Sequence, residues 1–359
     1  MIKRFVTVML CLLLSACGQQ YIVNEISLVQ TLGFDRAGSD VKGTVLIADY
    51  KQKGTVGALL SETITKSESN IMPSLNSTSK NPIEYGQLRM VLLGKDFSQK
   101  GISTVLSDLC RDPKISLRLH FGVSDRTAAE MLKAVKDSDD TNILSDSIKH
   151  NISDGNLPRS NLQTTLFDFY QEGKDLFLPY LTMKNKEIKV DGLALFRNEN
   201  YIFSVDMNDS LLLKMLIENA KNGTYLVPTE EENSTHRDYS LLKIVSSKTN
   251  YTLNHLKPLP SVSIHIKVQA QIKNLPHSID MNSGKQMLTF QRKTELYIEK
   301  NLRKFLSECK KNKVDPLGLG NFVIRNSRGW NSQSFDEVYT KMDTPVNVSL
   351  TIVNSGYSQ

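Results

Sequence analysis

The chain is 359 residues long, and 44 lysines and arginines against 38 aspartates and glutamates give it a net charge of +6 at pH 7. This mild excess contains no basic block, which disfavours nucleic acid as the partner. Hydrophobic residues make up 40% of the chain, and its length suits two or three globular domains.

The first residues have the pattern of a secretory signal. Lys3 and Arg4 precede an apolar run over residues 5–14, which is too short to span a bilayer of roughly 30 Å. The run ends in Leu14-Ser15-Ala16-Cys17, the form of a bacterial lipobox. We therefore predict a signal peptide over 1–16 and S-diacylglyceryl and N-acyl groups on Cys17, which anchor the chain on the outer face of the cytoplasmic membrane. A chance cysteine after a plain signal, and an uncleaved anchor, are the alternatives.

Residues 17–186 are predicted to form an N-terminal α/β domain, because strand-like and helix-like segments alternate. An amphipathic helix over 98–110 is stopped before Pro113, and Thr127 to Glu130 matches a capping box that opens another helix. The predicted strands, rich in β-branched and aromatic residues, cover 26–34, 42–50, 61–66, 87–93 and 117–123.

Residues 187–235 are predicted to form a small middle domain. Two short strands, 192–196 and 201–205, form a hairpin, and a helix follows over 209–220. Because such a unit buries little by itself, we expect it to dock on both flanking domains and to expose some apolar surface. The alternative is that all of its apolar residues are buried inside the monomer. The candidates alternate along the hairpin: Leu193, Leu195, Tyr201 and Phe203.

Residues 236–359 show the clearest periodicity. Apolar and polar residues alternate strictly over 262–272, a long amphipathic helix covers 286–312, and a closing strand covers 346–352. This predicts a C-terminal α+β domain with the long helix on a sheet. The whole chain is thus predicted to be α+β, an elongated protein of three domains, each with a mixed or antiparallel sheet and helices packed on it.

The sequence offers no catalytic, cofactor-binding or metal site. None of the six histidines is in an H-E-x-x-H or H-x-x-H arrangement, the spacing of a metal-binding helix. The S-x-x-K matches at Ser240 and Ser307 are expected by chance in a chain rich in serine and lysine. Cys110 and Cys309 follow apolar helix faces and are predicted to be small buried residues, with a disulfide between them as the less favoured alternative.

Four blocks after the lipobox resemble the Ger(x)C family, the lipoprotein C subunits of nutrient germinant receptors of endospore formers. They cover residues 25–35, 86–124, 192–206 and 314–323. The chain departs from many relatives in lacking a tryptophan just after Cys17 and in carrying Leu317 and Leu319 where phenylalanine is frequent. The matched residues are expected to have structural roles: Arg111, Asp112, Asp315, Gly318 and Gly320.

The resemblance implies a non-enzymatic exterior subunit that assembles with a multi-spanning A subunit and a transporter-like B subunit in the inner spore membrane. It implies no cofactor and no direct small-molecule ligand. We predict a lipid-tethered subunit required for receptor assembly and for the response to germinants. The alternative is an extracytoplasmic solute-binding lipoprotein that captures a small nutrient. A third hypothesis, a cell-wall enzyme, is disfavoured because the sequence shows no nucleophile–base constellation.

Overall fold

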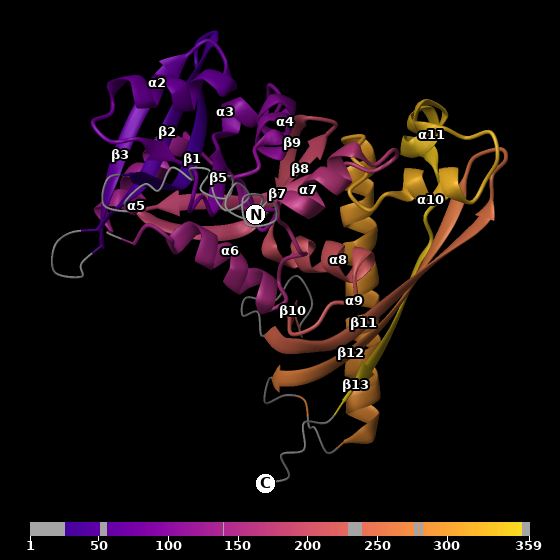
Figure 1. Ribbon diagram of the computed structural model, residues 1–359. Helices are drawn as coiled ribbons and strands as arrows, with labels where there is room; N and C mark the ends of the chain where they lie inside the picture. The colour runs from indigo at the N-terminus through magenta and orange to yellow at the C-terminus, as the bar shows by residue number, and fades with distance from the viewer. Residues whose placement is uncertain are drawn as a thin grey trace, which may run out of the picture.

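The computed structural model describes residues 26–50, 56–138, 140–228, 239–275, 279 and 283–353 (Figure 1). Cys17 and the predicted signal peptide lie outside these residues. Within them the chain forms two β-sheets with helices packed on each.

The described part of the large sheet has nine strands in the order β3-β2-β1-β5-β6-β7-β8-β9, with β4 beside β1. β1 pairs in parallel with β4 and β5, and β5, β6 and β7 continue the parallel part; the other pairs are antiparallel. The strands are β1 (Ser27–Ala37), β2 (Asp40–Tyr50), β3 (Val56–Thr65), β4 (Ile83–Glu84), β5 (Met90–Leu93), β6 (His120–Ser124), β7 (Phe177–Lys184), β8 (Glu187–Arg197) and β9 (Asn200–Val205).

Helices cover both faces of this sheet. The central strand β5 is apolar on both faces, so each face needs a cover. Met90 and Leu92 belong to one core cluster and Val91 and Leu93 to the other, and all four are fully buried. One face carries α2 (Ile71–Thr78), α3 (Lys95–Ser98), α4 (Ser103–Arg111) and α7 (Leu162–Tyr170), beside the short helix η2 (Glu68–Asn70). The other carries α5 (Ala128–Asp137) and α6 (Ile143–Ser153). The predicted cap of α5 is present, because the Thr127 hydroxyl accepts a hydrogen bond from the Glu130 amide.

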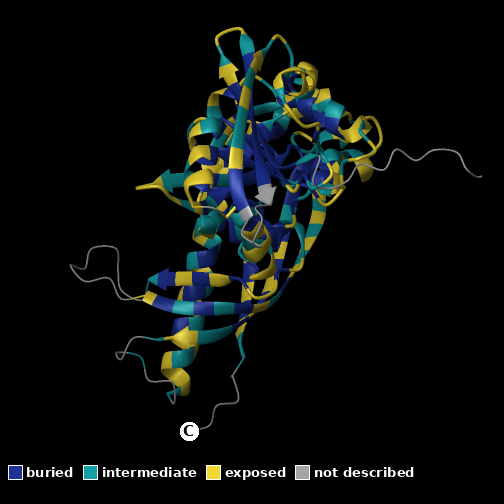
Figure 2. Cartoon of the chain, turned by 60° about the vertical axis from the view of Figure 1, so that its left-hand side comes forward, coloured by how far each residue is buried: buried dark blue, intermediate teal, exposed yellow. Residues whose placement is uncertain are grey.

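The second sheet has the order β10-β11-β12-β13 within the described residues. Its strands are β10 (Thr224–Pro228), β11 (Tyr239–His255), β12 (Ser261–Asn274) and β13 (Val346–Ile352), and the long helix α9 (Gly284–Lys311) lies along it. The predicted alternation is observed: Ile264, Ile266 and Val268 are buried, whereas His265 and Lys267 are exposed. Figure 2 shows buried and exposed residues alternating along these strands.

Side chains of α9 cover the outer edge of β13. They sit four residues apart on the helix, about 6 Å, and their backbone partners sit two residues apart on the strand, about 6.6 Å, so the two spacings match. The pairs are Arg303 Nη2 donating to the Val346 oxygen (2.7 Å), the Val348 amide donating to Glu299 (3.0 Å) and the Leu350 amide donating to Glu295 (2.9 Å). The edge that could pair with another strand is thereby blocked by a helix of the same chain.

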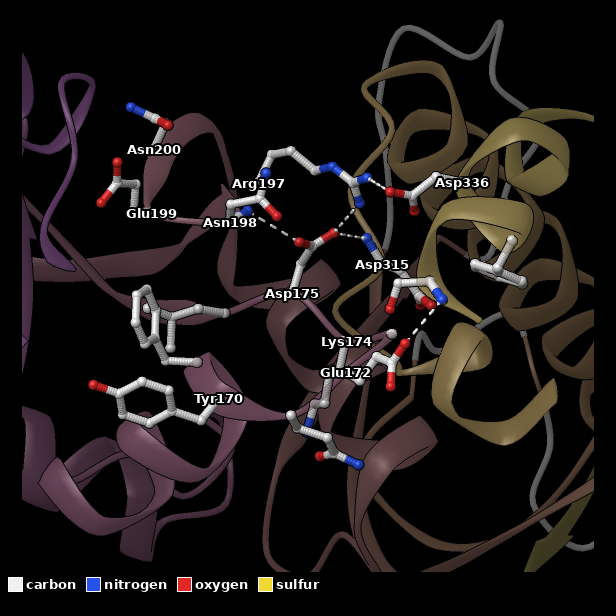
Figure 3. A pocket seen from close by; sticks show the side chains of 16 residues that line it. Tyr170, Glu172, Lys174, Asp175, Arg197, Asn198, Glu199, Asn200, Asp315 and Asp336 are labelled. Atoms are coloured by element: carbon white, nitrogen blue, oxygen red, sulfur yellow. Dashed lines mark hydrogen bonds and ion pairs between the residues drawn. The ribbon is translucent and has the colours of Figure 1, made fainter. Parts of the chain in front are cut away.

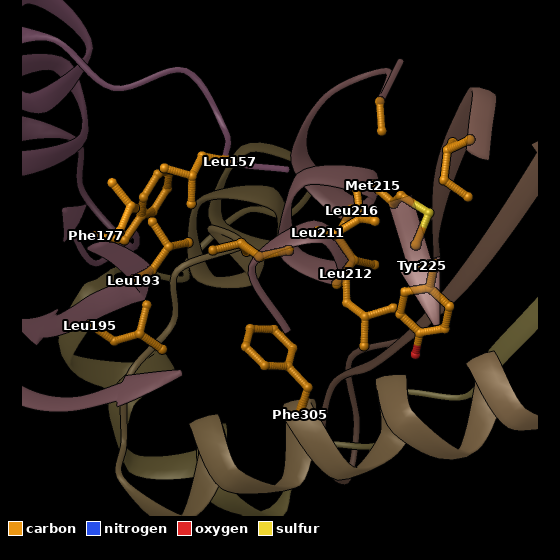
Figure 4. Packing of buried hydrophobic residues seen from close by; sticks show 14 of the residues in the cluster. Leu157, Phe177, Leu193, Leu195, Leu211, Leu212, Met215, Leu216, Tyr225 and Phe305 are labelled. Atoms are coloured by element: carbon orange, nitrogen blue, oxygen red, sulfur yellow. The ribbon is translucent and has the colours of Figure 1, made fainter. Parts of the chain in front are cut away.

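Helix α8 (Met207–Ile217) joins the two sheets. Residues 210–216 are buried without interruption, as expected of a helix enclosed on all sides. Figure 4 shows Leu193 and Leu195 of the large sheet, Leu211 and Leu212 of α8, and Phe305 of α9 in one apolar cluster. The described residues of the two sheets therefore share a continuous core.

The predicted mixed α and β fold class is confirmed, but the sheets do not divide where the domain boundaries were predicted. β8 pairs with β7, so the large sheet continues across residue 187, and β10 belongs to the second sheet. The described residues of the middle segment, 187–228, therefore form no sheet of their own. None of the four candidate apolar residues of the hairpin is exposed: Leu193 and Leu195 are fully buried, Tyr201 is 6% exposed, and Phe203 is partly buried against the core. Ile202, between the last two, is 40% exposed.

Candidate functional site

The polar turn that follows α9 is held together by hydrogen bonds to one buried aspartate. Asp315 lies inside it, and its carboxylate accepts hydrogen bonds from the amides of Gly318 (3.0 Å) and Gly320 (2.8 Å). Gly318 has φ +77°, a left-handed conformation that favours glycine. Helix α10 (Leu319–Arg325) starts from this turn, and α11 (Ser332–Val338) and η3 (Tyr339–Lys341) follow it. Asp315, Gly318 and Gly320 thus contact one another and shape the turn, which agrees with the structural role predicted for them.

A second aspartate, from the loop before β7, holds the turn against the large sheet (Figure 3). The Asp175 carboxylate accepts from the Asp315 amide (2.7 Å) and the Asn198 amide (3.1 Å), and the Asp175 amide donates to the Asp315 oxygen (2.8 Å). Arg197, at the end of β8, donates to Asp175 at 3.0 Å and also pairs with Asp336 of α11. One carboxylate thus connects three segments that are far apart in the sequence.

Close backbone contact completes this junction. The Asn321 amide donates to the Gly173 oxygen at 2.8 Å, and the Asn321 side chain donates to the Glu172 oxygen at 3.0 Å. The Ser332 amide donates to the Glu172 carboxylate at 3.0 Å. A Cβ at Gly173 would lie 2.5 Å from the Asn321 nitrogen, so the two main chains approach as closely as glycine allows. We call the contact between residues 172–175 and residues 315–321 the clasp.

Burial and neighbouring charges shift the pKa values of the ionisable groups at the clasp. Burial raises the pKa of Asp315 to about 7, against the opposing effect of the backbone amides that bond it. Burial also acts to lower the pKa of Arg197, but the nearby carboxylates of Asp175 and Asp336 outweigh it, and the pKa of Arg197 is raised. The guanidinium therefore stays charged between the two acids.

A cavity of about 410 Å³ opens beside the clasp. Tyr170 and Glu199 line it, and so do Lys174, Arg197 and Asp336. Its cations are already paired within the chain: Lys174 contacts Asp168 at 2.7 Å, and Arg197 contacts Asp175 and Asp336. Among the described residues, no group of three or more His, Cys, Asp or Glu side chains could hold a metal ion. The arrangement is suited to joining segments of the chain.

Other predicted residues lie apart from the clasp. Asp112 follows α4 as its C-cap, and its carboxylate accepts from the Lys114 amide at 2.8 Å, which gives it a structural role in the turn. Cys309 is buried as predicted, and burial raises the pKa of its thiol. Cys110 is exposed, contrary to the prediction, and both thiols are free, so they form no disulfide.

The S-x-x-K matches do not form nucleophile–base pairs. Ser240 is buried on β11, and Lys243 is three residues along the same strand, on its opposite face. On α9, the Lys310 ammonium instead donates to the Met342 oxygen (2.8 Å) and the Thr344 hydroxyl (2.7 Å).

Comparison with known proteins identifies the chain. Residues 19–183 match the family model described as spore germination protein N-terminal domain, and residues 191–356 match the model described as spore germination B3/GerAC like, C-terminal. The chain belongs to the Ger(x)C family of spore germination proteins. This makes it a C-type subunit of a germinant receptor and confirms the resemblance seen in the sequence.

Individual relatives agree with this membership. The Ger(x)C chain is 25% identical to spore germination protein GerQC of Bacillus cereus, over 99% of this chain and 100% of that one. It is 20% identical to the putative spore germination protein YfkR of Bacillus subtilis (strain 168), over 99% of this chain and 96% of that one. The crystal structure of the GerBC protein shares its fold with a TM-score of 0.56 and 14% identity, over 90% of this chain and 97% of the other. In the described residues, no helix is long and apolar enough to cross a bilayer.

Proposed function

We propose that this Ger(x)C protein is a non-enzymatic subunit of a nutrient germinant receptor, anchored through lipid on Cys17 to the outer face of the inner spore membrane. It assembles there with the membrane-embedded A and B subunits and is required for the response to germinants. Two acyl chains give stable membrane attachment where one chain does not. Confinement to the membrane surface then raises the effective concentration of the subunit toward its partners.

The observation that carries this proposal is the position of the lipobox. Leu14-Ser15-Ala16-Cys17 ends the apolar run, and the region matched by the family begins at residue 19. The family match thus starts two residues after the cysteine that would be acylated. The clasp supports a scaffold role, because its charged groups contact one another within the chain.

The test is Cys17→Ala, with Cys110→Ala as the matched control, since Cys110 is an exposed thiol outside the lipobox. We expect Cys17→Ala to lose the acyl mass and the membrane association of the subunit and to slow nutrient-triggered germination strongly. Cys110→Ala should change neither. Normal germination by spores whose subunit is unacylated would refute the need for the anchor.

The solute-binding alternative receives little support from the architecture. Proteins of that kind usually have two similar α/β lobes, whereas the two sheets here differ in strand number, strand order and helix cover. Thermal unfolding in the presence of amino acids, sugars and nucleosides tests it directly. A saturable rise in melting temperature with one of these solutes would favour solute capture.

A further inference from the structure

The parallel strands β1, β4, β5 and β6 begin side by side along one edge of the large sheet, which we call the amino edge, and the clasp lies beyond it at the start of β7. The Ser27 amide, at the start of β1, donates to the Pro82 oxygen just before β4 (2.8 Å). The Arg89 amide, just before β5, donates to the Gln30 oxygen (2.9 Å), and the His120 amide at the start of β6 donates to the Arg89 oxygen (2.9 Å). The segments that lead into β1, β4, β5 and β6 therefore lie next to one another.

These segments carry exposed basic side chains. Lys80, Arg89 and Arg118 precede β4, β5 and β6, all three are exposed, and none has an ion-pair partner among the described residues. Two carboxylates nearby are engaged by Lys114: Glu84 pairs with its ammonium at 2.7 Å, and Asp112 accepts from its amide at 2.8 Å. Leu117 lies beside Arg118 and is 54% exposed. A cluster of unpaired cations with one protruding apolar residue is the composition of a surface that contacts anionic lipid.

The predicted anchor would hold the amino edge close to the bilayer. Ten residue steps separate Cys17 from Ser27, so even a fully extended chain spans at most about 35 Å. Helix α9, with 28 residues, is about 42 Å long by itself. Its amino-terminal part projects with the second sheet beyond the large sheet (Figure 1). A tether shorter than the molecule restricts which end can meet the membrane.

We propose that the amino edge docks on the membrane surface, with Lys80, Arg89 and Arg118 against the phosphates of anionic phospholipids and Leu117 among the headgroups. This inference rests on the proposed lipid anchor at Cys17. Each basic side chain near an anionic surface shifts the ratio of docked to undocked molecules by about fivefold. Three of them together shift it by about a hundredfold, so the anchor supplies attachment and the amino edge supplies orientation.

The experiment uses the full lipidated protein in vesicles of phosphatidylcholine with or without phosphatidylglycerol. A fluorophore on Cys110, four residues before Lys114, reports proximity to a spin-labelled headgroup. The control probe is placed by Ser39→Cys with Cys110→Ser, in the turn between β1 and β2. That turn lies about 35 Å along β1 from the amino edge.

We expect quenching at Cys110 but not at residue 39, only with phosphatidylglycerol, and weakened by 1 M salt, where the Debye length is about 3 Å. Lys80→Gln with Arg89→Gln and Arg118→Gln should abolish it. The matched triple, which removes the same charge elsewhere on the surface, should not: Arg36→Gln, Lys100→Gln and Lys248→Gln.

Two failures are distinguishable. Protein that carries no acyl group or does not stay with the vesicles overturns the anchor, and the docking that depends on it. Protein that stays attached but is quenched equally at both probes overturns the docking and leaves the anchor in place. The same conclusion follows if quenching at Cys110 is unchanged by the triple substitution of Lys80, Arg89 and Arg118.

Discussion

Gly173→Ala is the sharpest perturbation of the clasp. Gly173 has φ +73°, and a Cβ there would lie 2.5 Å from the nitrogen of Asn321 and 2.7 Å from the carbonyl carbon of Gly320. Both are main-chain atoms, so no side-chain rotation relieves the overlap. The two segments must separate by close to 1 Å to reach ordinary contact, and the hydrogen bond from the Asn321 amide to the Gly173 oxygen, at 2.8 Å, lies directly across the gap.

The expected cost follows from two contributions. Holding alanine in the left-handed region costs about 1–2 kcal/mol. Weakening two hydrogen bonds across the clasp, those from the Asn321 amide and side chain, adds about 1 kcal/mol each. We therefore expect Gly173→Ala to lower the free energy of unfolding by about 3–4 kcal/mol. Gly38→Ala is the matched control, because Gly38 has φ +65° with nothing within 4 Å of its Cβ position, and should lose only the first contribution.

Urea unfolding of the two variants measures the difference, and hydrogen exchange locates it. The amides of Asp315, Gly318, Gly320 and Asn321 should exchange faster in Gly173→Ala, while those of Gly38→Ala should match the unaltered protein. Equal stability of the two variants would show that the main chains at the clasp can separate without loss, and the clasp would not be a tight joint.

Three further outcomes are expected. Because the folded pKa of Asp315 is raised to about 7, its contribution to stability is complete below about pH 4 and is lost as the pH rises through 7; Asp315→Asn should flatten that slope in thermal unfolding, and an unchanged slope would refute the assignment. Cys110 should react with an aromatic disulfide reagent in the folded protein and Cys309 only after unfolding, because Cys110 is exposed and Cys309 is buried with a raised thiol pKa; two fast thiols would contradict this. Glu299→Ala should cost about 1–3 kcal/mol in urea unfolding by leaving an amide of β13 unpaired, against less than about 0.5 kcal/mol for the half-exposed Glu308→Ala, and equal losses would show that the edge of β13 needs no partner.

The sequence predicts those elements in which one face is buried and the other is exposed, because apolar residues then repeat with the period of a strand or a helix. β12 alternates because one face packs under α9 and the other meets water, so the alternation by itself assigns Ile264 and His265 to opposite faces. The capping residue Thr127 is equally predictable, because a cap involves only neighbouring residues. The turn at Asp315 is indicated by family resemblance, and its hydrogen bonds to Gly318 and Gly320 are local.

The partners of that turn are not predictable, because nothing local marks them. Asp175 is 140 residues from Asp315 along the chain, and its loop has the composition of an ordinary polar connection. The pattern of β8 and β9 predicts a hairpin that pairs with itself, and therefore a separate domain, but it does not show that β8 also pairs with β7. Cys110 continues the apolar spacing of Leu106, but α4 ends at Arg111, and Cys110 is exposed although its neighbour Leu109 is buried.

Two different kinds of contact join the sheets, and they have different consequences. The core around α8 is apolar, and burial of apolar area stabilises association without fixing an angle. The clasp consists of directional hydrogen bonds to Asp175 and Asp315, whose geometry tolerates little rotation. With the anchor proposed at Cys17, a fixed angle between the sheets would hold the second sheet and α9 at one height and orientation relative to the bilayer. A weakened clasp should therefore reduce coupling to membrane partners even where the core keeps both sheets folded.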